Sequence, residues 1–171
     1  MSPEIIAIDK EIKVVGLSLQ KSGLPMNYEA IGRLWDIFRE RRGAYAENAV
    51  VPHVEYGVCI CDNWPHEYLA GRAVSEIGAL AENKARRFPS APETRAVSEV
   101  GDLGDGWISF IIPPGRYAKV SEELGGYAFD IEKWAEENGL SVKDTYLCMD
   151  VHPAGAAAGD SAGVYYLWPI K

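Results

Sequence analysis

WISFIIPPGRYAKV, residues 107–120, is the stretch that decides the fold. Its largely apolar residues predict a long strand. Proline cannot donate a hydrogen bond to a sheet ladder, so Pro113-Pro114 must break that strand at a bulge or a sheet corner. A helix with apolar residues at helical spacing is predicted over 127–135, followed by strands at 145–152 and 163–170. The order of this half is therefore strand, helix, strand, strand.

The N-terminal half has the same order. Residues 11–19 predict a strand with a bulge near Gly16. Asn27 is a suitable N-cap for a helix with an amphipathic stripe. Strands are then predicted at 55–61 and 67–76.

Two β-α-β-β units, about 11–76 and 107–170, predict an α+β fold in a single domain, 1–171. Each unit is expected to lay its helix on an antiparallel three-stranded sheet, and a pseudo-twofold axis is expected to relate the units. A crevice between equivalent halves commonly holds a small ligand, so we expect a central ligand groove. The segment 82–105, rich in charge, Pro and Gly, is predicted to carry a short helix or a flap around 80–88.

The composition excludes several classes of protein. Hydrophobic residues make up 47% of the 171 positions and charged residues 25%, which is typical of a globular chain. The net charge of -8 repels phosphate backbones, so we expect no direct nucleic-acid ligand. No run approaches the roughly 18 apolar residues of a membrane span, so we expect no membrane contact.

The cysteines and the start of the chain predict a compartment. Cys59, Cys61 and Cys148 cannot all pair with one another, and none forms a Cys-x-x-Cys spacing, which fits a reducing cytoplasm. The start at Met1 lacks the pattern of a signal peptide. We therefore expect a cytoplasmic protein.

Four stretches, whose order and spacing cover almost the whole chain, carry a resemblance to a known family. The stretches are Tyr56-Gly57-Val58 with Glu67-Tyr68-Leu69-Ala70-Gly71; Ile112-Pro113-Pro114-Gly115-Arg116-Tyr117-Ala118; Trp134 with Asn138-Gly139; and Trp168-Pro169-Ile170-Lys171. Together they resemble the GyrI-like small-molecule-binding superfamily, the effector-binding domain of AraC- and MerR-type transcription regulators. In that family the similar stretches are, in the same order, the paired central strands, I-P-x-G-x-Y-A, W-L…S-G and Y-I-P-I.

The resemblance implies a duplicated fold whose groove holds planar, often cationic, apolar compounds. Members of the family usually place a glutamate in an F-E-V-Y strand at the groove floor. The simplest match to residues 148–153 puts Asp150 at the glutamate and His152 at the tyrosine. A match shifted through Tyr146 puts Leu147 there instead and removes the carboxylate. The two matches remain alternatives at this point.

Carboxylates and aromatic rings are the candidate ligand-binding groups. A ring face attracts a desolvated cation, whereas the alternative is that the same rings only fill the core. A carboxylate in an apolar strand can act as counter-ion, whereas the alternative is an exposed residue at a strand end. The candidates are Asp150, Glu67, Trp35, Tyr56, Tyr68, Tyr117, Trp134, Tyr165 and Trp168.

Motifs for metal binding and nucleophilic catalysis are missing from the sequence. His53, His66 and His152 show no metal-ligand spacing, and there is no Gly-x-Ser-x-Gly. We expect no metal and no cofactor, and we assign no catalytic residue.

The leading hypothesis is a stand-alone domain that binds a small aromatic or cationic compound, as a sensor or a sequestering protein. The segment before the first predicted strand is too short for a helix-turn-helix reader, so we expect no DNA-binding domain. A homodimer or a partner regulator is a further expectation.

Two alternatives remain. The resemblance permits a hydrolase of strained electrophiles, in which Asp150 or Glu67 activates water and Tyr117 or Tyr68 donates a proton. The acidic charge also permits an inhibitor of a DNA-processing enzyme such as gyrase.

Overall fold

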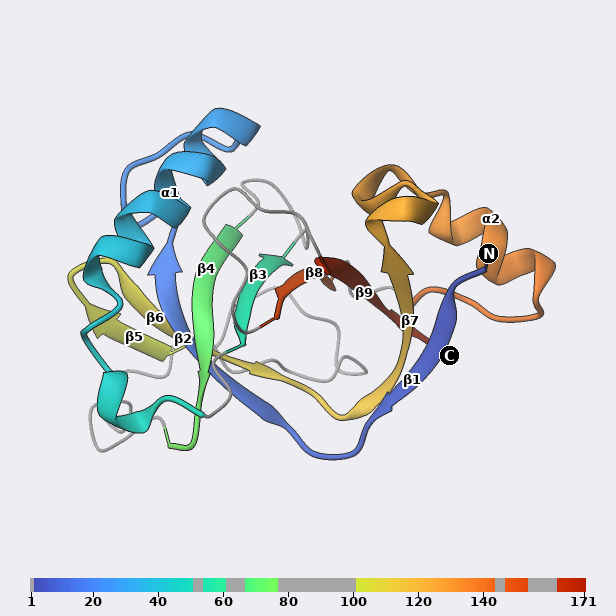
Figure 1. Ribbon diagram of the computed structural model, residues 1–171, viewed down its shortest axis with the longest axis horizontal. Helices are drawn as coiled ribbons and strands as arrows, with labels where there is room; N and C mark the ends of the chain where they lie inside the picture. The colour runs from blue at the N-terminus through green and yellow to red at the C-terminus, as the bar shows by residue number, and fades with distance from the viewer. Residues whose placement is uncertain (1, 51–53, 61–66, 77–100, 144–146, 154–162) are drawn as a thin grey trace.

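This α+β protein is built on one antiparallel sheet (Figure 1). The computed structural model describes residues 2–50, 54–60, 67–76, 101–143, 147–153 and 163–171. Nine strands of these segments lie in the order β1-β7-β9-β8-β3-β4-β2-β6-β5. The strands are β1 Glu4–Ile8, β2 Ile12–Ser18, β3 Glu55–Ile60, β4 Glu67–Val74, β5 Gly101–Gly104, β6 Trp107–Ile112, β7 Gly115–Ser121, β8 Leu147–His152 and β9 Tyr165–Ile170. The α-helices described are α1 Tyr28–Arg41 and α2 Ile131–Glu137.

The centre of the sheet is the pair β3–β8, which joins the two halves of the chain. Counted outward from this pair, the N-terminal half runs β3, β4, β2, and the C-terminal half runs β8, β9, β7. The sequence predicted two separate sheets. The structure has one, because β3 and β8 pair over six residues from Glu55–His152 to Ile60–Leu147.

The predicted break at Pro113-Pro114 is present. The chain leaves β6, which pairs with β2, and enters β7, which pairs with β1 and β9. The Tyr117 hydroxyl donates to the Pro113 carbonyl oxygen at 2.6 Å. The sequence placed 107–120 within a single unit, whereas β6 lies in the N-terminal half of the sheet and β7 in the C-terminal half, so the prolines stand where the chain passes between the halves.

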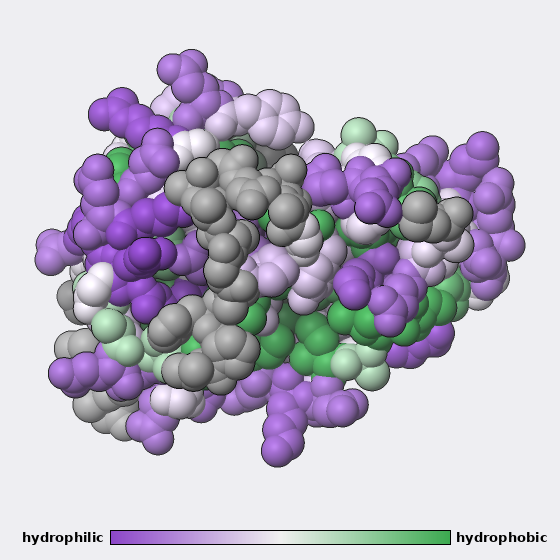
Figure 2. All heavy atoms as spheres, viewed as in Figure 1, coloured by the Kyte–Doolittle hydropathy of each residue, from purple (hydrophilic) through white to green (hydrophobic). Residues whose placement is uncertain are grey.

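Helix α1 begins and packs as its sequence predicts. The Asn27 side chain caps it by accepting a hydrogen bond from the Ala30 backbone N–H at 2.8 Å. Leu34, Trp35 and Phe38 are buried, and α1 packs on β4 and β2. In Figure 2, hydrophilic side chains cover the regions of α1 and α2, and hydrophobic ones gather between them over β1 and β7.

The bulge predicted near Gly16 is absent, because β2 pairs without a register shift with β4 and with β6. Gly16 instead allows a close approach of strands. It lies opposite Gly71, and a Cβ added to it would sit 2.3 Å from the Ala70 carbonyl oxygen. Glycine is therefore required at this position by the close packing of β2 against β4, and not by a β-bulge.

Two differences concern elements. Strands β1 and β5 were not predicted, and α2 begins at Ile131, capped by Asp130, because residues 126–128 form a separate 3-10 turn. The helix or flap expected around 80–88 lies outside the described residues, as do Cys61, His53 and His66. Among the helices described, none is long and apolar enough to cross a bilayer.

Candidate functional site

A cavity of about 320 Å³ lies over the middle of the sheet, between the start of α1 and Tyr127. Its volume falls at the lower end of the range usual for small-molecule sites. The lining residues are Met26, Asn27, Tyr28, Ile31, Trp35, Cys59, Tyr68, Tyr127, Cys148, Asp150 and Tyr166.

The cavity has an exposed aromatic rim and a buried floor. Tyr28 is 80% exposed and Tyr127 53% exposed, whereas Trp35 and Tyr68 are 6% and 5% exposed. A ligand that enters between the two exposed tyrosines therefore leaves water as it approaches Trp35 and Tyr68.

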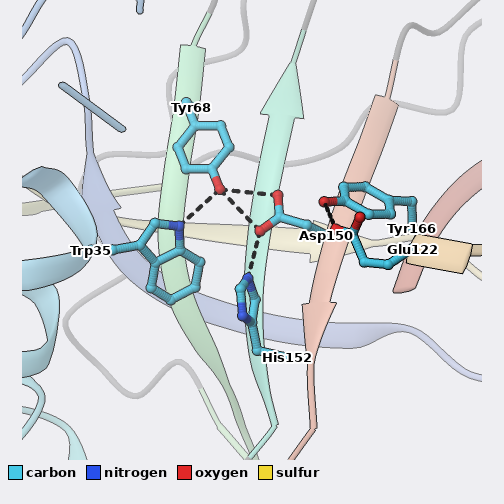
Figure 3. A network of polar contacts seen from close by, with 6 residues as sticks. All are labelled: Trp35, Tyr68, Glu122, Asp150, His152 and Tyr166. Atoms are coloured by element: carbon cyan, nitrogen blue, oxygen red, sulfur yellow. Dashed lines mark hydrogen bonds and ion pairs between the residues drawn. The ribbon is translucent and has the colours of Figure 1, made fainter. Parts of the chain in front are cut away.

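Asp150 is held at this floor by a chain of hydrogen bonds across three elements (Figure 3). The Tyr68 hydroxyl, on β4, lies 3.0 Å from Asp150 Oδ1 and 3.1 Å from Oδ2, on β8. The Trp35 indole Nε1–H, on α1, donates to the Tyr68 hydroxyl at 3.0 Å. The network fixes the carboxylate while leaving it part-exposed to the cavity, since the Asp150 side chain is 19% exposed.

Gly57 makes the bond between Tyr68 and Asp150 possible. It lies on β3, between the two strands, opposite Ala70 on one side and Asp150 on the other. A Cβ there would sit 2.0 Å from the Tyr68 hydroxyl and 2.2 Å from Asp150 Oδ1. The hydrogen bond can cross β3 only because this position has no side chain.

His152 is the second partner of the carboxylate. It lies two residues after Asp150 on β8 and hence on the same face. Its Nε2 is 2.7 Å from Asp150 Oδ2, and its ring centroid is 4.7 Å from that of Trp35. A cationic ligand would therefore share Asp150 with His152.

Two tyrosines of the wall keep their protons. Burial raises the pKa of the Tyr68 phenol well above its ordinary value, and the charge of Asp150 raises it further. Burial, followed by the hydrogen bond that Tyr166 donates to Glu122 Oε1 at 2.6 Å, raises the pKa of Tyr166. Both phenols are therefore protonated at neutral pH and can donate hydrogen bonds to their carboxylate partners.

The charge of the wall has one sign. Among the lining residues that the structure describes, Asp150 is the one carboxylate, and none is a lysine or an arginine. The other groups are aromatic rings, aliphatic chains, thiols and an amide. This combination can stabilise a cation with an apolar body.

Three of the predicted site residues line the cavity: Asp150, Tyr68 and Trp35. Tyr56, Tyr117 and Tyr165 lie instead with the core on the opposite face of the sheet. The reason is strand alternation, because Tyr56 neighbours Gly57, and Tyr165 neighbours Tyr166, on the other face.

The remaining predicted residues stand behind or away from the wall. Trp168 packs behind it, with its ring centroid 5.9 Å from that of Tyr166 and 6.4 Å from that of Tyr127. Trp134, on α2, donates to the Ser2 hydroxyl at 3.2 Å. Glu67 is buried on the β2 side, where it accepts hydrogen bonds from the Ser18 hydroxyl at 2.7 Å and the Tyr68 backbone N–H at 2.9 Å.

Sequence reasoning missed most of the rim and both thiols. Cys148 lies two residues before Asp150, and Cys59 lies two after Gly57, so strand parity would have placed both thiols on the carboxylate's face. The rim comes from the start of α1 and from the 3-10 turn over 126–128, where helical periodicity marks apolar positions without showing which of them face a cavity. The rim residues are Met26, Asn27, Tyr28 and Tyr127.

Metal ligands do not gather in the described part of the chain, where no group of three His, Cys, Asp or Glu could hold an ion.

Comparisons with known proteins show the fold. The solved structure of SAV2435 bound to tetraphenylphosphonium resembles this chain with a TM-score of 0.52 at 10% sequence identity, over 100% of this chain and 94% of that one. The integron cassette protein VCH_CASS2, from the mobile metagenome of Vibrio cholerae, gives a TM-score of 0.44 at 12% identity, over 100% and 97%. Neither a protein-family model nor a curated protein matches the sequence. The chain thus shares its overall fold with the first of these proteins.

Proposed function

We propose that this protein binds small apolar cations in the cavity, as a ligand-binding domain of the GyrI-like class. The observation that carries the proposal is the part-exposed Asp150 carboxylate at the floor of an aromatic cavity. Sensing and sequestration both begin with this binding step. The three cysteines of the sequence favour a reducing compartment such as the cytoplasm.

Charge and shape act together in this proposal. The aromatic wall favours transfer of an apolar surface out of water, and its ring faces attract a cation by about 0.5–2 kcal/mol each. Asp150 supplies the opposite charge from a side chain that is 19% exposed, and an ion pair is stronger at such a partly buried position than at the surface. The neighbour of the same fold was solved with a phosphonium cation that carries four phenyl groups, which supports this ligand class.

Either Asp150 or Leu147 could occupy the position of the family glutamate, and their places in the sheet favour Asp150. Asp150 lines the cavity, whereas Leu147 lies in the core of the opposite face. We therefore assign the glutamate's role to Asp150. The matching strand orders of the two halves, β3-β4-β2 and β8-β9-β7, support a duplicated arrangement about a pseudo-twofold axis.

A pair of ions with one shape and opposite charge tests the proposal. Tetraphenylphosphonium and tetraphenylborate each carry four phenyl groups around one centre, and both are titrated by calorimetry and tryptophan fluorescence. We expect the cation to bind and the anion to bind much more weakly. Equal affinities would reduce the cavity to an apolar pocket without charge selectivity. Mass spectrometry of the recovered ligand separates binding from turnover.

Asp150→Asn should weaken the binding of tetraphenylphosphonium by about 1.5–3 kcal/mol, roughly 10- to 100-fold, because it removes the charged partner. The matched control is Asp36→Asn, since Asp36 lies on α1 with its side chain 75% exposed. The control should bind as the unmodified protein does. An Asp150→Asn variant with unchanged affinity would contradict the role of the carboxylate.

A further inference from the structure

Two thiols lie side by side on the cavity wall. Cys59 on β3 and Cys148 on β8 are register partners, so their side chains share one face of the sheet. Both line the cavity, and each is 7% exposed. Their place on the wall puts them within reach of a molecule that occupies the cavity.

The strand pairing sets the distance between them. Directly opposite residues of antiparallel strands have Cβ atoms about 4.5–5.5 Å apart. A disulfide draws its Cβ atoms to about 3.5–4.5 Å. The two ranges meet at about 4.5 Å, so the register places the two sulfurs close enough for one atom to bond to both.

The rest of the wall suits an aryl group on that bridging atom. Tyr68, on β4, is the register partner of Cys59. Tyr166, on β9, is the register partner of Asp150, which follows Cys148 by two residues on β8. Both rings line the same cavity as the thiols. An aromatic substituent would therefore stay out of water while the central atom lies at the sulfurs.

We propose that Cys59 and Cys148 form a dithiol site for trivalent aryl arsenicals. Arsenic(III) is a soft centre, and thiol sulfur is the soft ligand of proteins. With an aryl arsenoxide, two As–S bonds form while the As–O double bond and two S–H bonds break. The two protons leave with the oxygen as one water, and arsenic keeps its oxidation state, so no oxidant is consumed. The site goes beyond cation binding, because it requires the two thiols and no charge.

Phenylarsine oxide is the probe. The purified, reduced protein is mixed with it and examined by intact mass spectrometry, then alkylated with N-ethylmaleimide and mapped by peptide mass spectrometry. We expect one phenylarsenic unit per chain, Cys59 and Cys148 both protected from alkylation, and release by a small dithiol such as 2,3-dimercaptopropanol. The absence of an adduct, or an adduct that leaves either thiol open to alkylation, would overturn the proposal.

Variants complete the test. Cys59→Ser and Cys148→Ser should each weaken binding by about 10²- to 10⁴-fold, because the second thiol of the intact pair binds intramolecularly. Cys61→Ser is the matched control, since it removes the third cysteine of the sequence, and it should bind as the unmodified protein does. An adduct that requires Cys61, or that survives either of the other substitutions at full affinity, would contradict the site. The alkylation map of the unmodified protein decides the question if a variant does not fold. Thiol protection and phosphonium titration are separate readouts, so either proposal can fail alone.

Discussion

A single missing side chain determines how the floor of the cavity is built. Gly57 leaves room on β3 for the Tyr68 hydroxyl to reach Asp150 from the next strand. Strand interiors normally lose stability at glycine, because the unfolded chain gains freedom and the folded chain loses a packed side chain. Here the loss is offset by a hydrogen bond that any Cβ would displace.

Gly57→Ala should therefore lower the free energy of unfolding by about 1–3 kcal/mol, because the added methyl overlaps three oxygen atoms of the network. It should also weaken tetraphenylphosphonium binding, since Asp150 is no longer held. Gly32→Ala is the matched control: nothing lies within 4 Å of its added Cβ on α1, so it should stabilise the protein by up to about 1 kcal/mol. Chemical denaturation and calorimetry measure both effects. Equal changes in the two variants would contradict the role given to Gly57.

The buried carboxyl of Glu67 should make the free energy of unfolding depend on pH. Burial raises its pKa above the ordinary 4.5, although hydrogen bonds from Ser18 and from backbone N–H groups act in the opposite direction. Between pH 4.5 and the raised value the folded state binds a proton that the unfolded state has lost. The contribution of Glu67 to the free energy of unfolding is thus present at low pH and falls as pH rises through that window.

Glu67→Gln should remove this fall, because an amide does not titrate. The measurement is the difference in unfolding free energy between the two proteins, followed by denaturation from pH 4 upward through neutrality, since other carboxylates cancel in the difference. We expect the variant to gain relative to the unmodified protein as pH rises. A difference that is independent of pH, or that changes in the opposite direction, would contradict the raised pKa.

At the scale of elements, periodicity predicted what lies in the sheet interior and in α1. The apolar residues of β2, for example, predicted a strand at its position, and Asn27 predicted the start of α1. Strands β1 and β5 were missed for physical reasons. β1 is five residues long and largely exposed at the sheet edge, and it is specified by pairing with β7, far along the chain. β5 spans four residues with glycine at both ends.

The candidate site was only partly predictable for a related reason. Alternation separates the two faces of a strand, but it does not say which face meets the cavity. Tyr165, a predicted candidate, lies on the face away from the cavity, whereas Asp150 and Tyr68 lie on the cavity face. Register between distant strands, such as Cys59 opposite Cys148, follows from the assembled sheet and not from either segment alone.

At the scale of the whole molecule, the pairing of β3 with β8 makes one sheet of the two halves, and a fully buried contact lies within it. Met149 on β8 is opposite Val58 on β3, and both side chains are 0% exposed. A substitution that weakens this contact should lower the stability of both halves together, because the hydrogen-bonded ladder runs from one half into the other without a break.

Met149→Ala should lower the free energy of unfolding by about 2–5 kcal/mol, the usual cost of a buried methionine cavity. Unfolding by denaturant should remain a single transition, with tryptophan fluorescence and far-UV circular dichroism coincident before and after the change. Two separate transitions would show that the halves unfold independently and would contradict a continuous sheet.

The crossing at Pro113-Pro114 has a consequence for any attempt to divide the chain. β1 precedes β2 in sequence yet pairs with β7, while β6 precedes β7 yet pairs with β2. Thus β1 pairs within the C-terminal half of the sheet, and β6 pairs within the N-terminal half. A fragment ending at Ile112 would lose the neighbour of its first strand, and the complementary fragment would lack β1 along β7. Reassembly from these two pieces would need β1 to pair with β7 and β3 to pair with β8 between the fragments, so this topology favours fragment complementation over autonomous folding of either piece.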